Sequence, residues 1–195
     1  MPQLTRQNLW TLEEYARRRP AFRAEVIAHK KLRTLAIGPH VTLIFEDETT
    51  IRYQVQEMLR IEKTFEEDGI LAELEAYNPL IPDGRNLKAT MMIEYEDAAE
   101  RARELQRLKG IEDRVWMRVA GFDPIYAVAD EDMERENDTK TSAVHFLRFE
   151  FTPAMIAAFR TSAVSVGIDL PAYAIGIDPL PDDQRGALAL DFAPG

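Results

Sequence analysis

The spacing of apolar residues predicts a helical first third of the chain, interrupted by one hairpin. Apolar positions recur every three or four residues at 20–31, 50–63 and 66–77, a period typical of amphipathic helices. Thr11 begins a capping-box sequence, which predicts a short helix after it. Pro20 is expected to end or bend that helix and to suit the first turn of the next one.

Alternating apolar residues predict strands through the rest of the chain. They are expected at 32–37, 40–46, 88–95, 114–120, 125–129 and 142–151, with short strands at 163–168 and 174–177. Further helices are expected at 97–109, 152–162 and 182–192. The charged residues 130–140 lack apolar periodicity, which predicts a solvated loop or helix.

Strands and helices do not alternate strictly in this order. We therefore expect an α+β fold in which helices pack on a mainly antiparallel sheet. A length of 195 residues fits one domain, residues 1–195. The alternative is that the residues from about 163 onward form a loosely attached C-terminal appendage.

The composition indicates a folded protein with an acidic surface. Apolar residues make up 46% of the chain, and 24 basic against 34 acidic residues give a net charge of −10. This charge repels phosphate backbones and anionic lipids, so we expect no nucleic-acid partner and no membrane contact. No apolar run approaches the roughly 18 residues of a membrane-spanning helix, and the N-terminus lacks the apolar run of a signal peptide. A cytoplasmic location is therefore expected.

Several kinds of cofactor chemistry lack their sequence motifs. The chain has no cysteine, which excludes disulfides, thiolate zinc sites and a cysteine-ligated iron–sulfur cluster on this chain. It contains no glycine-rich phosphate loop for a nucleotide and no Gly-x-Ser-x-Gly nucleophile elbow. Iron or another divalent metal, held by histidine and carboxylate side chains, is the cofactor that stays open.

Polar residues on the predicted helix 50–63 form the first candidate site. Arg52, Gln56 and Arg60 share one face at four-residue spacing, Glu57 lies on the adjoining face and Gln54 on the far side. Arginine pairs with carboxylate or phosphate through two parallel hydrogen bonds. This set therefore predicts a binding site for a small anion. The alternative is that Glu57 and Arg60 merely pair on the helix surface.

A metal site made of histidine and carboxylate ligands is the second candidate. The three histidines occur in no Glu-x-x-His or His-x-His pair, so such a site must assemble from separate elements. The ligands that we consider are His40, Glu57, Glu94 and His145. His40 is favoured because it follows a turn at the start of a strand. His145 alternates with apolar residues, so a hydrogen-bonded core histidine is its alternative interpretation.

Six long and unusual strings occur in order along the chain. They are GPHVTL at 38–43, YQVQEMLR at 53–60, YNPLIP at 77–82, LKATMMIE at 87–94, GIED at 110–113 and VHFLRF at 144–149. Together they resemble a bacterial family known only as a domain of unknown function, the DUF3501 family, over almost the whole length. One string departs from the family pattern: Leu170 stands where relatives often have a histidine, which weakens any metal site in the C-terminal segment.

The resemblance implies a context rather than a mechanism. Members of the family are often encoded beside rubrerythrin-like diiron proteins and iron–sulfur oxidoreductases, which implies these as partners and an accessory role in iron or peroxide metabolism. Three hypotheses stay open: a non-catalytic accessory or small-ligand-binding protein, a metal-dependent enzyme or metal carrier, and a structural protein-interaction module. Whether the protein is an enzyme or an oligomer is also open.

Overall fold

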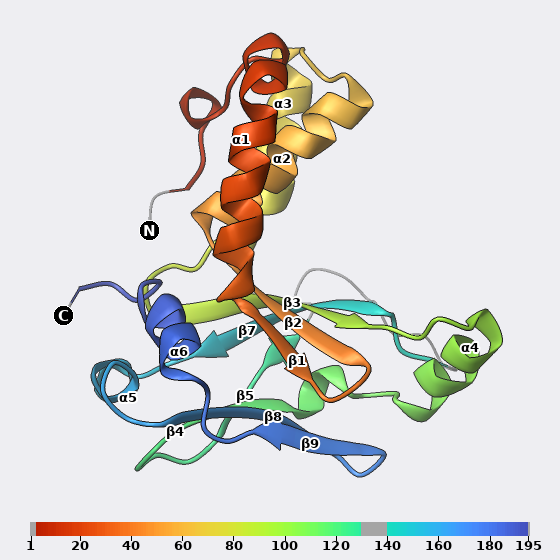
Figure 1. Ribbon diagram of the computed structural model, residues 1–195, viewed down its shortest axis with the longest axis vertical. Coiled ribbons are helices and arrows are strands. Elements are labelled where there is room, and N and C mark those ends of the chain that lie inside the picture. Colours follow the sequence, from red (N-terminus) through yellow and green to blue (C-terminus); the bar gives the residue numbers. More distant parts are fainter. Residues whose placement is uncertain (1–2, 130–139, 195) are drawn as a thin grey trace.

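The computed structural model describes residues 3–129 and 140–194 and confirms the α+β fold. Figure 1 shows two parts, a pair of antiparallel sheets and a group of helices that stands on them. The predicted strands therefore form two sheets instead of one. Residues 130–139 of the predicted charged segment lie outside the described residues.

The first part, which we call the helical arm, consists of α1, α2, α3 and two short 3-10 helices. Their bounds are α1 Leu12–Lys31, α2 Glu48–Glu62, α3 Glu67–Tyr77, η1 Arg6–Asn8 and η2 Asn78–Leu80. The apolar faces of α2 and α3 pack together with Leu4 and Leu9 from the N-terminal segment. The arm thus has apolar clusters of its own, separate from the core of the sheets.

The predicted break at Pro20 is wrong, because α1 runs continuously through it. A proline inside a helix removes one backbone hydrogen bond. Here the side chains before and after it, Tyr15 and Phe22, are both buried in one aromatic cluster with Trp10 and Tyr53. Packing on both sides of Pro20 therefore keeps the two halves in one helix.

The second part, the sheet body, is built from two antiparallel sheets. The first sheet has the order β1 Thr34–Ile37, β2 Val41–Glu46, β3 Asn86–Ile93, β7 Val144–Glu150 and β6 Val128–Ala129. The second has the order β5 Ile125–Tyr126, β4 Val115–Val119, β8 Val164–Leu170 and β9 Tyr173–Ile177. Since β5 and β6 are separated only by Ala127, the chain passes there from the second sheet to the first.

The core of the body lies between the two sheets and continues to their ends. Alternate residues of β3 and β4, such as Met91 and Met117, point into one apolar cluster. Three further helices complete the body, namely α4 Ala98–Arg107, α5 Pro153–Phe159 and α6 Asp182–Ala189, and a 3-10 helix, η3 Glu112–Arg114, precedes β4. None of the described helices is both long enough and apolar enough to cross a bilayer.

The interpretation of residues after 163 as a loose appendage is wrong. Strand β8 lies between β4 and β9, with Val164 and Val166 buried in the core. Near the C-terminus, Phe192 packs edge-on against Phe151 and Phe159. These residues are therefore an integral layer of the body, held by pairing and packing partners that are distant in sequence.

Candidate functional site

Gln56, one of the predicted ligand-binding residues, is fully buried and bound within the protein. Its side-chain oxygen accepts a hydrogen bond of 2.8 Å from the backbone N–H of Trp10, and its amide nitrogen lies 3.4 Å from the Trp10 carbonyl oxygen. The amide thus holds the segment before α1 against α2. Gln54 lies half-buried on the same helix.

Glu57 joins α2 to α1. Its carboxylate accepts two hydrogen bonds from the guanidinium of Arg19, at 2.7 and 2.8 Å, and a third from the Tyr15 hydroxyl at 2.7 Å. Arg60 adds longer contacts of 3.3 and 3.4 Å on the exposed side, as the surface-pair alternative expects. The hydrogen bonds from Arg19 lower the pKa of Glu57 to about 2.

Arg52 differs from its neighbours on α2. Its guanidinium carbon lies 4.1 Å from the centre of the Trp10 ring and 5.6 Å from that of Phe22. Its Nε atom is buried and has no hydrogen-bond partner among residues 3–129 and 140–194. The predicted ligand-binding face is therefore divided: Gln56, Glu57 and Arg60 make intramolecular contacts, whereas Arg52 is held on an aromatic ring.

His40 lies at an open cleft of the sheet body. Its ring stacks on Tyr95 with 4.0 Å between ring centres, and its Nδ1 lies 3.0 Å from the backbone oxygen of Glu94. The cleft has a volume of about 910 Å³ and is also lined by Glu96, Glu100 and Arg101. The Glu94 carboxylate accepts a hydrogen bond from Thr42 at 2.8 Å. His40 and Glu94 thus border the same cleft, with His40 in contact with the backbone of Glu94 and not with its carboxylate.

His145 is a buried core histidine with polar partners. Its Nε2 lies 2.8 Å from the Thr141 hydroxyl and 3.0 Å from the carbonyl oxygen of Ser142. Thr141 in turn donates to the buried carboxylate of Glu112 at 3.0 Å. The alternative interpretation of His145 as a hydrogen-bonded core residue is confirmed.

The four predicted metal ligands are not brought together. Among residues 3–129 and 140–194, no three histidine or acidic side chains lie close enough to hold one metal ion. His40 and Glu94 border the cleft, but Glu57 lies in the helical arm, where it binds Arg19, and His145 faces the core. Patterns with a period of two or 3.6 residues indicate on which face of a strand or helix a residue lies, but not how far apart two elements are. The prediction that these four residues form one metal site was therefore wrong.

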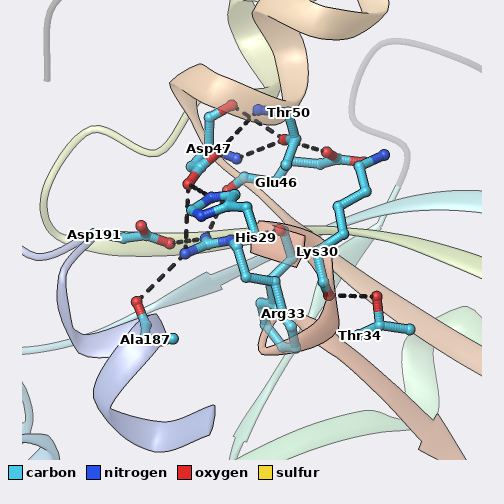
Figure 2. A network of polar contacts seen from close by, with 10 residues as sticks. His29, Lys30, Arg33, Thr34, Glu46, Asp47, Thr50, Ala187 and Asp191 are labelled. Carbon is cyan, nitrogen blue, oxygen red and sulfur yellow. Dashed lines mark hydrogen bonds and ion pairs between the residues drawn. The ribbon is translucent and has the colours of Figure 1, made fainter. Parts of the chain in front are cut away.

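A buried polar network lies where the arm meets the body (Figure 2). Its centre is Arg33, a residue with only 1% of its surface exposed. The guanidinium donates to the backbone oxygens of Phe45 at 2.9 Å, Glu46 at 3.2 Å and Ala187 at 3.3 Å. It also forms an ion pair with the buried carboxylate of Asp191. One side chain thus connects β2 with the C-terminal segment.

Asp47 extends this network to the helical arm. Its carboxylate lies 3.6 Å from Arg33 and 2.5 Å from Nε2 of His29, near the end of α1. It also caps α2 by accepting a hydrogen bond of 2.9 Å from the backbone N–H of Thr50. Glu46, buried beside it, accepts hydrogen bonds from Thr50 and Thr90 at 2.5 and 2.7 Å. We call these residues, with Arg33 and Asp191, the junction network.

Burial dominates the electrostatics at the C-terminal end of the junction network. Removal of Asp191 from water raises its pKa to about 6, although the nearby charge of Arg33 acts in the opposite direction. This ion pair, together with the neighbouring carboxylates and backbone acceptors, holds the end of α1, strand β2 and the C-terminal segment together. The role of Arg33 is structural, since all of its hydrogen bonds are made to other groups of the described protein.

The sequence interpretation missed the junction network. Arg33 follows the end of α1 and directly precedes β1, where it continues the buried alternation of Leu35 and Ile37. This two-residue alternation was a usable signal for its burial. The partners Asp47 and Asp191 could not be identified, because they are 14 and 158 positions away, and only the fold brings them together.

The comparisons with known proteins agree with this fold. The family model described as "Protein of unknown function (DUF3501)" matches residues 3–192. The chain belongs to the DUF3501 family. A crystal structure from Burkholderia pseudomallei, described as a novel protein of unknown function, shares 55% sequence identity with this DUF3501 protein. The similarity covers 98% of this chain and 100% of that one, with a TM-score of 0.93. No curated protein matches this chain.

Proposed function

We propose that this DUF3501 protein is a non-catalytic accessory protein of an iron or peroxide redox system in the cytoplasm, and that it binds a partner through its helical arm. The proposal is supported chiefly by one observation: the end of the arm carries large apolar side chains in solvent. Phe65, between α2 and α3, has 74% of its surface exposed, Ile61 62% and Leu71 48%. All three belong to the end of α2, the α2–α3 connection or the first turns of α3, and large exposed apolar side chains are typical of protein-interaction sites.

A groove lies beside Phe65 and supports the same function. Its volume is about 410 Å³, and its lining includes the apolar side chains of Trp10, Leu12, Leu59 and Ile70. An apolar side chain of a partner that enters the groove would lose contact with water together with Phe65, which is how interface anchors gain most of their binding free energy. Because this chain has a net charge of −10, a partner with basic residues around its apolar contact suits it best.

The partners that the family resemblance implies are a rubrerythrin-like diiron protein and an iron–sulfur oxidoreductase. We propose that one of them docks at the end of the arm. No catalytic chemistry on this chain is required for such a role. Two of the polar residues predicted to bind a ligand on α2, Gln56 and Glu57, instead hold the arm together.

The test is retention of these partners under native conditions. The wild-type protein and Phe65→Ser are immobilised, and the neighbouring diiron and iron–sulfur proteins are passed over each. Leu190→Ser is the matched control, since Leu190 is 75% exposed but lies in the sheet body. We expect retention by the wild type and the control and loss by Phe65→Ser. Failure of the wild type to retain either protein would refute the proposal, and so would equal retention by Phe65→Ser.

A metal-dependent enzyme or metal carrier is the second candidate, supported by the cleft at His40. An imidazole and three carboxylates, those of Glu94, Glu96 and Glu100, border this cleft and are ligand types for iron, manganese or zinc, although no three of them lie close enough in the described residues to hold one ion. Elemental analysis of untagged protein tests it. Stoichiometric metal that is lost in His40→Ala would support this function, and metal-free protein that added divalent ions do not stabilise would contradict it.

A further inference from the structure

Arg52 has no anionic partner within the described chain. Its buried Nε has no hydrogen bond, and no described carboxylate lies within ion-pair distance of the guanidinium. Nearby arginines behave differently: Arg18 pairs with Glu14 at 2.8 Å and Arg19 with Glu57 at 2.7 Å. Arg52 is thus a half-buried cation that lacks its usual partner.

The surroundings of Arg52 make its positive charge energetically unfavourable when no anion lies beside it. Burial lowers its pKa, and the positive charge of Arg18 acts in the same direction, while only the charge of Glu48 opposes them. Arg18 also lies over the Trp10 ring, at 5.2 Å from its centre. A bound anion would offset both the free-energy cost of desolvation and the repulsion between the two guanidinium groups.

The position of the guanidinium is fixed in advance. Trp10, which supports one face of it, is itself held by the buried amide of Gln56 and by an edge contact with Phe22 at 5.1 Å. A guanidinium stacked in this way loses little further freedom on binding. Since only Nε is buried, the terminal nitrogens can donate to a ligand that arrives from solvent.

We propose that Arg52, held on Trp10, is a binding site for a carboxylate-bearing ligand at the surface of the helical arm. A planar carboxylate matches the fork of donors at the edge of the guanidinium. Phosphate is less suitable, because the charge of Glu48 acts on Arg52 and the whole chain is acidic, which disfavours a dianion. The site stands without the proposed partner contact at Phe65, although Trp10 borders both.

The intrinsic fluorescence of Trp10 offers a direct readout. The chain has two tryptophans, so a Trp116→Phe background leaves Trp10 as the sole reporter. Succinate, and separately inorganic phosphate, is titrated into this protein against sodium chloride of equal ionic strength. The same titrations are done with Arg52→Met, with Arg52→Lys, and with Arg103→Met as the control, since Arg103 is an exposed arginine on α4.

We expect a saturable change of Trp10 emission with succinate and the same change in the Arg103→Met control. Binding should weaken about tenfold or more in Arg52→Met, because a charge-assisted pair is lost, and it should also weaken in Arg52→Lys, which keeps the charge without the fork. Urea unfolding should show Arg52→Met to be about as stable as the Trp116→Phe background, since the removed cation has no described anionic partner and methionine can still pack on the Trp10 ring.

Three results would overturn the proposal. The first is the absence of a saturable response to succinate in the Trp116→Phe protein. The second is tighter binding of phosphate than of succinate, which would refute the carboxylate assignment. The third is an unchanged response in Arg52→Met, or a large loss of its stability, which would make Arg52 a structural residue.

Discussion

Buried polar residues in this protein mostly bind its own backbone and side chains. Gln56 binds the backbone of Trp10, His145 binds Thr141 and Arg33 binds three carbonyl groups. A buried polar group without a partner costs free energy, so each of these contacts is needed for the fold whether or not a ligand is present. Residue type alone therefore does not separate a ligand-binding residue from a structural one.

The structural role of Gln56 can be separated from that of Gln54 by substitution. In Gln56→Leu, the N–H and C=O groups of Trp10 lose their partner, and we expect the free energy of unfolding to fall by about 1–3 kcal/mol. Gln54→Leu, on the half-buried face of the same helix, should change it by about 0.5 kcal/mol or less. Urea denaturation measures both. Equal losses in the two variants would contradict the assignment.

At the scale of elements, α1 and α2 form a pair held by charge as well as by apolar contacts. Arg19 and Tyr15 of α1 bind Glu57 of α2, and Trp10 packs beside them. The carboxylate is mostly shielded from solvent and accepts a two-pronged hydrogen bond from Arg19, so it is more than a surface ion pair. This contact explains why the arm keeps its shape although its apolar clusters are small.

The contribution of Glu57 should depend on pH in a defined direction. Its pKa is depressed from 4.5 to about 2, so the folded protein binds fewer protons than the unfolded chain between these values. The stabilisation is present above about pH 4.5 and is lost as the pH falls toward 2. At pH 7, Glu57→Gln should lower the free energy of unfolding by about 1–3 kcal/mol.

The measurement is urea unfolding of the wild type and Glu57→Gln at pH 7 and at pH 3. The difference between the two proteins should shrink at the lower pH. Glu25→Gln, an exposed residue of α1, serves as the control and should show little difference at either pH. A constant difference between wild type and Glu57→Gln across this range would show that the charge of Glu57 does not stabilise the pair.

For the whole molecule, the C-terminal third completes the body and helps to hold the arm. Strand β8 pairs with β4 and β9 in the second sheet, and Asp191 reaches Arg33 at the base of the arm. Chain segments that are more than 150 positions apart thus meet in the junction network. The arm and the body are therefore expected to unfold cooperatively.

Deletion of residues 163–195 tests this organisation. The deletion removes the central partner of β4 and exposes the apolar core between the sheets, so we expect no folded product. Far-UV circular dichroism and size-exclusion chromatography of the truncated chain provide the measurement. A compact, folded protein after the deletion would restore the interpretation of this segment as an appendage.

Most elements of the fold follow from local patterns in the sequence. Predicted and observed bounds of α3 and β2 differ by one residue, and those of β3 by two at each end. Three features did not follow: the continuity of α1 through Pro20, the division of the strands into two sheets, and the integration of residues after 163 into the body. All three depend on packing partners, which a local pattern does not contain.

The sequence by itself determined the helices, the strands, the acidic surface and the inward direction of His145, because these depend on residue spacing and composition. Only the tertiary structure decided that Glu57 binds Arg19, that Arg33 lies buried against Asp191, and that Arg52 has no described partner. The physical reason is distance: periodicity gives the face on which a side chain lies, whereas a site requires side chains from remote elements within a few ångströms, and only the packed core sets that separation.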